Sequence, residues 1–306
     1  MIVVAGEALI DLVPHDRGDA LTPLRPVRGG GPYNTAVALG RLGSETAFCS
    51  RLSTDAFGTS LVERLVSEGV STQLVQRGPE PTTLAVASVA ADGSASYTFY
   101  TGGTADRLFT LPDALPDRTR AASFGTCSLV LEPGASAYEE LMRRESARGV
   151  FVALDPNVRA ELIPDPDAYR ARFRGWLPHV SLLKLSEEDA DWLGAGLPEL
   201  AAAGPAAVVL TRGGDGLTVL TRGGARYSVP AAPVEVVDTI GAGDTVNAAL
   251  LHALARRDLL APGALAALGA DGWGEILAFA SRAAAVTCSR AGAEPPYARE
   301  VGGASL

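Results

Sequence analysis

Lysine is almost missing from this chain. Lys184 is the single lysine among 26 basic residues, and 35 acidic residues give a formal net charge of -9. Binding to nucleic acid without base specificity requires a basic face that displaces counterions from phosphates. The acidic balance therefore argues against a nucleic-acid partner and favours a small-molecule ligand.

Long apolar runs and cysteine clusters are also missing. No stretch reaches the roughly 18 uncharged apolar residues of a membrane-spanning helix, so no membrane partner is expected. Met1 runs directly into "IVVAGEALIDLV" without the features of a signal peptide, which predicts a cytoplasmic protein. Cys49, Cys127 and Cys288 lie far apart without C-x-x-C spacing, so we expect buried thiols rather than disulfides or a zinc site.

The common nucleotide-binding motifs are absent as well. No G-x-x-x-x-G-K-[ST] motif occurs. The stretch "RGGGPYNTAVALG" from Arg28 to Gly40 is not a dinucleotide-binding motif, because Pro32 and Tyr33 disrupt its glycine spacing and no strand leads directly into it. A nucleotide must be held in another way.

Strand-like and helix-like segments alternate along the chain. Short β-branched runs occur at Ile2 to Val4, Ser128 to Leu131, Val150 to Asp155, Ser181 to Leu185 and Ala207 to Thr211. Amphipathic segments between them, "AFGTSLVERLVSEG" and "ASAYEELMRRESARG", end on Gly69 and Gly149. We expect an α/β protein in which residues 1–306 form one domain around a mostly parallel sheet that is covered on both faces.

Residues 82–100 interrupt this alternation. They form two strand-like runs around Asp92 and Gly93 with no helix between them, and residues 13–25 also break the pattern. We expect these segments, about 12–27 and 81–104, to form a small β lid whose exposed strands could pair in a homodimer. A second hairpin is expected around Gly223 and Gly224 at the edge of the main sheet.

The stretch "DTIGAGDTVNAAL", from Asp238 to Leu250, carries the clearest chemical signal. Gly241 and Gly243 let the backbone approach a ligand closely, and amide hydrogens at a helix start bind phosphate oxygens. A carboxylate at Asp244 would be unfavourable beside a phosphate unless it accepts a proton from an attacking hydroxyl. The alternative is that Asp244 merely caps the helix.

Together with "GGGPYNTAVALGRLG", this stretch resembles the two signatures of the ribokinase-like, or PfkB, carbohydrate kinases. The resemblance extends from Gly6 to Ala293, and "GEALIDLVP", "RLSTDAFG" and "DPNVR" are most similar to bacterial fructokinases, followed by 2-keto-3-deoxygluconate kinases. It implies a three-layer α/β/α core with a β lid and transfer of the ATP γ-phosphate to a sugar's primary hydroxyl. Asp244 matches the catalytic base, and Gly241, Ala242 and Gly243 match the anion hole.

The resemblance also implies ligand-binding residues. On the sugar side these are Asp11, Gly30, Gly31 and Asn34. Phe99 and Tyr100, which could lie against a sugar face, and Arg159, which could place a positive charge near the substrate, are further candidates. On the ATP side they are Lys184, Ser186, Thr211, Gly213, Gly216 and the helix around Ala280. Asp238 matches a monovalent cation site (K⁺), and Glu187 or Asp189 would organise Mg²⁺, since "SEED" at 186–189 replaces the family's N-x-x-E motif.

Several of these residues have simpler explanations that stay open. Asp11 could end a strand, Asn34, Asp55 and Asp238 could cap helices, and the segment around Ala280 could be plain core. Phe99 and Tyr100 could simply fill the hairpin.

The acceptor sugar is less certain than the reaction. Relatives that act on ketodeoxygluconate tend to carry "YYR" on the lid, where this chain has "FYT" with Thr101, so we expect a neutral sugar, with fructose converted to fructose 6-phosphate. A keto-acid substrate remains an alternative, because Arg107 or Arg159 could pair with its carboxylate. Other sugars or nucleosides also remain alternatives. A sugar-binding regulator without catalysis is the alternative of another class, and the intact Asp244 argues against it.

Overall fold

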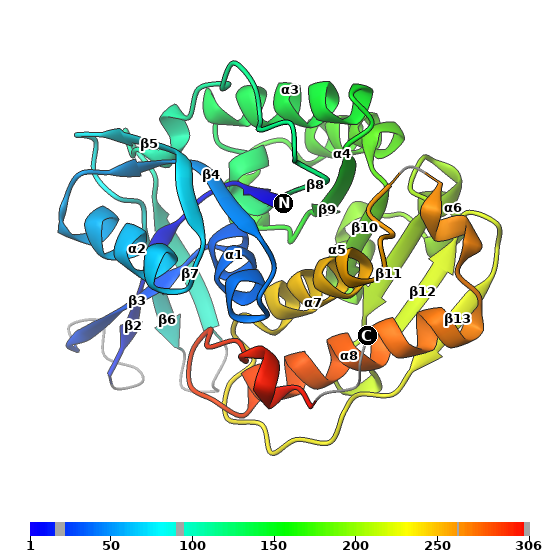
Figure 1. Ribbon diagram of the computed structural model, residues 1–306. Coiled ribbons are helices and arrows are strands. Elements are labelled where there is room, and N and C mark those ends of the chain that lie inside the picture. The colour runs from blue at the N-terminus through cyan, green and yellow to red at the C-terminus, as the bar shows by residue number, and fades with distance from the viewer. Residues whose placement is uncertain (16–21, 90–94, 262, 303–306) are drawn as a thin grey trace.

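A large sheet forms the centre of the protein in the computed structural model, which describes residues 1–15, 22–89, 95–261 and 263–302 (Figure 1). It has nine strands in the order β13-β12-β11-β10-β9-β8-β1-β4-β5. All neighbours are parallel except β11 with β12 and β12 with β13. The strands are β1 (Ile2–Ala5), β4 (Thr46–Ser53), β5 (Ser71–Gly78), β8 (Ala121–Gly125), β9 (Phe151–Asp155), β10 (Leu182–Ser186), β11 (Ala207–Thr211), β12 (Leu217–Thr221) and β13 (Arg226–Val229).

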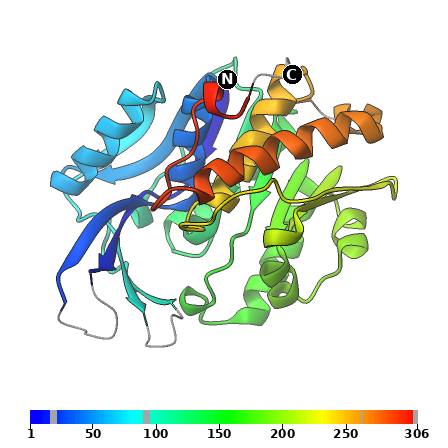
Figure 2. The ribbon, with the colours of Figure 1, turned by 90° about the horizontal axis from the view of Figure 1, so that it is seen from below.

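Helices cover both faces of this sheet, which confirms the three-layer α/β/α prediction (Figure 2). One face carries α1 (Gly31–Arg41), α2 (Ala56–Ser67), α7 (Ala242–Arg256) and α8 (Ala270–Cys288); the other carries α3 (Gly134–Ala147), α4 (Pro166–Trp176), α5 (Glu187–Leu193) and α6 (Leu197–Ala202). Each face has its own buried core, with Trp273 and Leu250 in one and Trp176 and Tyr138 in the other. Nearly continuous apolar strands such as β9 are buried on both sides, as parallel strands require.

The predicted amphipathic helices form for the expected local reasons. Helix α2 buries Leu61 and Leu65, and the Asp55 side chain caps its start by accepting a 2.7 Å hydrogen bond from the Gly58 amide. Gly69 follows this helix and Gly149 follows α3, each with a positive φ, 75° and 80°. The capping interpretation of Asp55 is therefore confirmed.

The strand predicted at Ser128 to Leu131 is wrong. Strand β8 ends at Gly125, and Thr126–Leu129 form a 3-10 turn. Leu129 is fully buried in the core, so the apolar run reflects packing rather than strand pairing. A short buried run has the same apolar character in either conformation, which is why periodicity did not separate them.

A second sheet of four strands has the order β3-β2-β6-β7 and projects from one side of the core (Figure 2). Its strands are β2 (Leu9–Pro14), β3 (Leu24–Gly29), β6 (Leu84–Val89) and β7 (Ala95–Tyr100), so the expected hairpin is present and β2 and β3 extend beyond the expected 12–27 segment. The turn expected at Asp92 and Gly93 lies outside the described residues. The hairpin expected around Gly223 and Gly224 is present as β12 and β13.

None of the helices in the described ranges is long and apolar enough to cross a membrane. Cys49 and Cys127 are buried free thiols, as expected. Cys288 is only partly buried, and the expectation of a core position is wrong for it because its side chain borders a cavity at the end of α8.

Candidate active site

A polar cavity of about 290 Å³, called the first cavity below, lies where the carboxyl ends of the central strands meet the small sheet. Open α/β sheets commonly bind ligands at this edge. The lining residues come from the segments after β1, β8 and β9, from β2 and β7, and from the starts of α1 and α7. They are Glu7, Leu9, Asp11, Gly30, Gly31, Asn34, Tyr97, Phe99, Thr126, Cys127, Asn157, Arg159, Thr239, Ile240, Gly241, Gly243 and Asp244.

A second cavity of about 250 Å³ lies on the other side of the start of α7. Glycine and small apolar residues make up most of its lining: Thr211, Gly213, Gly214, Gly216, Leu217, Ala231, Ala232, Val234, Val236, Thr239, Ala242, Gly243, Val246, Ser281, Ala284, Ala285 and Cys288. Thr239 and Gly243 line both cavities. The start of α7 therefore forms the boundary between a polar and an apolar cavity.

The start of α7 allows a ligand to approach the backbone closely. Gly241 is the N-cap residue with φ 76°, and no side chain caps the helix, so its first turn presents amide hydrogens at the positive end of the helix dipole. The Ala242 amide is engaged at 3.2 Å by the Thr239 carbonyl oxygen. A Cβ atom on Gly241 would lie 2.6 Å from the Cβ of Ala293, so glycine is required by packing as well as by φ.

Asp244 is buried in the first turn of α7 and is held by Asn34, whose Nδ2 donates to Asp244 Oδ2 at 2.9 Å. Burial raises the pKa of Asp244, and the Asn34 hydrogen bond together with the charges of Lys184 and Arg159 opposes that rise. Asn34 lies inside α1, after the N-cap residue Gly30, so neither Asn34 nor Asp244 is a helix cap and both capping alternatives are wrong. The carboxylate is positioned toward the first cavity instead.

Lys184 reaches the same helix start from strand β10. Its Nζ lies 2.9 Å from Asp155 Oδ2, and both side chains are almost completely buried. A Cβ on Gly243 would be 2.9 Å from this Nζ, so the ammonium group lies directly beside the entrance of α7. Burial alone would lower the pKa of Lys184, but the neighbouring carboxylates of Asp155 and Asp244 raise it, and the ammonium stays charged.

The first cavity gathers six of the seven residues predicted for the sugar side: Asp11, Gly30, Gly31, Asn34, Phe99 and Arg159. Burial raises the pKa of Asp11, and the positive charge of Arg159 opposes this effect in part; the resulting pKa is about 6. Asp11 lies inside β2 rather than at its end, so strand termination does not account for it. Tyr100 is the exception: its side chain is 59% exposed and outside the cavity, because neighbouring residues of strand β7 point to opposite faces.

The second cavity gathers Thr211, Gly213 and Gly216 from the end of β11 and the loop after it. The placement predicted for Ala280 is wrong, because this residue is fully buried in the core on the inner side of α8. Ser281, Ala284, Ala285 and Cys288 on the adjacent face of the helix line the cavity. The core-packing alternative is therefore correct for Ala280, and the cavity wall is displaced by one residue.

Comparison with known proteins decides the family. Residues 1–299 match the description "pfkB family carbohydrate kinase". This chain belongs to the pfkB family of carbohydrate kinases. A fructokinase of Rhizobium leguminosarum bv. trifolii is 39% identical over 277 residues, which cover 88% of this chain and 84% of the relative. A fructokinase of Vibrio alginolyticus is 31% identical over 262 residues, 83% of each chain.

Solved structures agree with this assignment. The crystal structure of fructokinase with bound ATP from Xylella fastidiosa superposes with a TM-score of 0.85 at 28% identity and covers 98% of this chain and 96% of that one. A double mutant of the Vibrio cholerae O395 fructokinase, with fructose, ADP and potassium ion bound, has a TM-score of 0.82 at 25% identity, over 95% and 93% of the two chains.

In this pfkB kinase the acidic residues predicted for Mg²⁺ have other partners. Ser186 and Asp189 form a capping box at the start of α5, and Asp189 also accepts a 2.7 Å hydrogen bond from the Val158 amide. Glu187 is half exposed and pairs with Arg212 at 3.2 Å. Among the described residues no group of three or more His, Cys, Asp or Glu side chains could hold a metal ion. The sequence pattern around 186–189 therefore encodes a helix start.

Asp238 connects two loops of the kinase. Its Oδ1 accepts a 3.0 Å hydrogen bond from the Ile240 amide, and its Oδ2 accepts one of 2.8 Å from the Gly292 amide. The helix-capping alternative is therefore wrong for this residue. The carboxylate ties the segment before α7 to the segment after α8.

Sequence reasoning missed part of the first cavity. Tyr97 lies on the same face of β7 as Phe99, and the two-residue period of a strand could have indicated it. Glu7 is 1% exposed; its Oε2 accepts a 3.0 Å hydrogen bond from the Ser128 amide while its Oε1 has no partner among the described residues. Burial raises the pKa of Glu7 to about 7. Thr126 and Asn157 line the cavity with positive φ angles of 61° and 38°. Asparagine tolerates such a backbone, but this preference does not indicate a ligand site.

Proposed function

We propose that this protein is an ATP-dependent fructokinase that transfers the γ-phosphate of ATP to the primary hydroxyl of fructose and produces fructose 6-phosphate. One observation carries the proposal: the uncapped start of α7 separates a polar cavity that contains Asp244 from an apolar cavity. A sugar on one side and a nucleotide on the other would meet at the backbone of Gly241, Ala242 and Gly243, where a phosphate would take the place of the Thr239 carbonyl at the Ala242 amide. The names of the relatives support fructose and ATP as substrates.

The acceptor hydroxyl would be activated by Asp244. The Asn34 amide fixes one carboxylate oxygen, which leaves Oδ1 to accept the proton. Burial raises the pKa of this carboxyl, which makes it a stronger base than an exposed aspartate. Because phosphoryl transfer passes through a loose transition state, position and charge matter more than base strength.

The transferred phosphoryl group would lie against the start of α7. Its developing negative charge would be stabilised by the helix amides and by the buried ammonium of Lys184 beside Gly243. The adenine would occupy the second cavity between the glycine turn at 213–216 and the small residues Ala284 and Ala285. Magnesium, when bound, would neutralise phosphate charge.

The residues predicted to bind Mg²⁺ and K⁺ can be tested against their hydrogen bonds and ion pairs. Asp189 has both oxygens engaged by backbone amides and Glu187 is paired with Arg212, so neither fits a direct Mg²⁺ ligand. Mg²⁺ commonly keeps several waters and binds through substrate phosphates, which agrees with this lining. Asp238 likewise accepts one backbone amide on each carboxylate oxygen, so a K⁺ ion beside it is proposed from the potassium ion in the Vibrio cholerae fructokinase structure.

Fructose is favoured over an acidic sugar by the charge of the first cavity. Three carboxyl groups, those of Glu7, Asp11 and Asp244, line it with the guanidinium of Arg159. The carboxylate of an acidic sugar would be repelled by these groups. Arg159 is the one observation that favours a ketodeoxygluconate kinase instead, because guanidinium groups pair with carboxylates.

The four-stranded sheet is proposed as a lid over the sugar. Asp11 of β2 and Phe99 of β7 contribute to the cavity from this sheet, so its approach to the core would exclude water from the reaction. Among the described strands, β3 and β7 form its edges, where a homodimer could pair. Crystals with and without sugar that superpose in this sheet would contradict closure. A cytoplasmic location belongs to the same proposal.

Steady-state kinetics with purified protein and ATP test the substrate. The panel contains fructose, ketodeoxygluconate, ribose, adenosine and fructose 6-phosphate. We expect fructose to give the highest kcat/KM. Turnover of the keto acid without turnover of fructose would refute the substrate assignment, and sugar binding without any turnover would indicate a non-catalytic regulator.

A further inference from the structure

A third cavity, of about 420 Å³, lies outside the catalytic cleft between strand β3, helices α1 and α2, and the segment after α8. We call it the arginine cavity. Asn34 lines both this cavity and the first cavity. Its lining is Ile10, Arg25, Pro26, Val27, Arg28, Tyr33, Asn34, Val37, Phe57, Ser60, Arg64, Ala291, Gly292, Ala293 and Glu294.

The charge of this lining is opposite to that of the whole protein. Arg25, Arg28 and Arg64 contribute positive groups, and Glu294 contributes the only carboxylate of the lining, in a chain with a net charge of -9. Guanidinium groups that converge on one cavity bind phosphate in a bidentate manner. The positive charge of the lining therefore suits a small anionic ligand.

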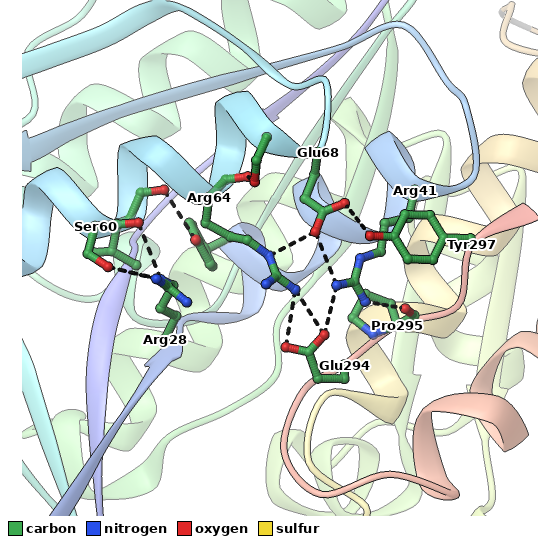
Figure 3. A network of polar contacts seen from close by, with 11 residues as sticks. Arg28, Arg41, Ser60, Arg64, Glu68, Glu294, Pro295 and Tyr297 are labelled. Atoms are coloured by element: carbon green, nitrogen blue, oxygen red, sulfur yellow. Dashed lines mark hydrogen bonds and ion pairs between the residues drawn. The ribbon is translucent and has the colours of Figure 1, made fainter.

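Two of the guanidinium groups are already held in place, as Figure 3 shows. Arg28 donates through Nη2 to Ser60 Oγ at 2.8 Å, and Arg64 is fixed between Glu68 and Glu294, with both ion pairs at 2.9 Å. In both arginines Nη1 makes no hydrogen bond or ion pair within the described part of the chain. Donors that are already ordered bind a ligand with a smaller loss of side-chain entropy.

The cavity also has room and an apolar wall. Its volume lies within the several hundred Å³ that are typical of small-molecule sites. Phe57, which is 37% exposed, borders it together with Ile10 and Val27. Phe57, Ser60 and Arg64 are spaced three and four residues apart and so share one face of α2. A phosphate group at the arginines would leave space for an organic body against Phe57.

We propose that the arginine cavity is a binding site for a small phosphomonoester such as a sugar phosphate, separate from the catalytic cleft. The ligand's phosphate would bind Arg25, Arg28 and the Nη1 group of Arg64. Its body would lie against the apolar wall.

The position of this site connects it to the reaction centre. Glu294 is held by Arg64 and by Arg41, whose side chain also donates to the Pro295 carbonyl oxygen and lies over the Tyr297 ring (Figure 3). The neighbouring Ala293 packs against Gly241. A phosphate that competes with Glu294 for Arg64 would therefore act on the segment that supports the start of α7.

Calorimetric titration of the full-length protein with fructose 6-phosphate and with inorganic phosphate tests the proposal. We expect the variant Arg25→Gln/Arg28→Gln to bind fructose 6-phosphate at least about tenfold more weakly at this site, a loss of charge-assisted hydrogen bonds. The matched control Arg118→Gln removes an exposed arginine that pairs with Glu45 and is not part of the cavity lining, and it should bind as the wild type does. Inorganic phosphate should bind more weakly than the sugar phosphate.

Glu294→Gln gives a test of opposite sign. It removes the carboxylate that competes for Arg64 and should tighten fructose 6-phosphate binding several-fold, whereas Glu80→Gln, which releases Arg51, should not. Fructose 6-phosphate bound in the catalytic cleft would bind equally to wild type and the double arginine variant. Equal isotherms for these two proteins would overturn the site, and equal affinity for the two probes would overturn the role of the apolar wall.

Discussion

Asn34 Nδ2 lies 2.9 Å from Asp244 Oδ2 and donates a hydrogen bond to it, although the two residues are 210 positions apart. Asn34 belongs to the first turn of α1 and Asp244 to the first turn of α7, which pack against each other on the same face of the sheet. The bond brings the two signature stretches of the family together at one carboxylate. It fixes the rotamer of Asp244 and lowers its pKa against the effect of burial.

Asn34→Ala should therefore shift the pH dependence of turnover. Loss of the hydrogen bond removes an interaction that favours the ionised carboxylate, so the pKa of Asp244 rises. The acidic limb of the kcat profile should move to higher pH, and kcat at neutral pH should fall about tenfold or more. Profiles of kcat between pH 5 and pH 9 measure this. An acidic limb at the same pH as in wild type would show that Asn34 does not influence the ionisation of Asp244.

Gly241→Ala should reduce turnover because the added methyl group meets Ala293 at 2.6 Å and displaces the start of α7. Gly43→Ala is the matched control: Gly43 has φ 83° against 76° for Gly241, and a Cβ there meets nothing within 4 Å. Both variants should lose about 1 kcal/mol or more of folding stability, because alanine is strained at a positive φ. Only Gly241→Ala should lower kcat/KM for ATP strongly. Equal kinetic losses in the two variants would argue against the proposed anion hole.

The Lys184 to Asp155 ion pair predicts an asymmetric effect on stability. Lys184→Met leaves the buried carboxylate of Asp155 without its partner, and breaking such a pair costs about 3–5 kcal/mol. Lys184→Met/Asp155→Leu should recover part of this loss because no buried charge is left unpaired. Urea unfolding measures both. ATP affinity should stay low in the double variant, and recovery of affinity would contradict the contact of Lys184 with phosphate.

Burial of Glu7 predicts how stability depends on pH. Its pKa rises from 4.5 to about 7 in the folded protein, so the folded state binds the proton more tightly than the unfolded state. This contribution is complete below pH 4.5 and is lost as pH rises through about 7. Glu7→Gln should therefore gain stability over wild type at pH 8 relative to pH 5, on the order of 2 kcal/mol. A pH-independent difference in urea unfolding would contradict this.

The sequence predicted the features that depend on local rules. Strand and helix alternation gave the three-layer core, and the glycine turn before an alanine-rich run gave the start of α7. Ser128 to Leu131 was misassigned because burial and strand pairing leave the same apolar pattern in a short segment. Tyr100 was misplaced because the strand's register decides which face a residue occupies, and the register is set by pairing with β6.

Other features depend on contacts between distant segments. Neither the bond between Asn34 and Asp244 nor the burial of Glu7 beside Ser128 has a local pattern that would indicate it. Asp189 was assigned to magnesium because the family resemblance aligned "SEED" at 186–189 with the N-x-x-E motif, whereas in the structure the same residues form a capping box.

Turnover of Asp244→Asn with fructose and ATP tests the central proposal most directly. The substitution keeps the size of the side chain and removes the proton acceptor, so kcat should fall at least about a thousandfold while sugar and ATP affinities stay close to those of wild type. Asp55→Asn, which alters an aspartate that caps α2 outside the first cavity, serves as the control. Near-normal kcat in Asp244→Asn would contradict the role of this carboxylate as the base.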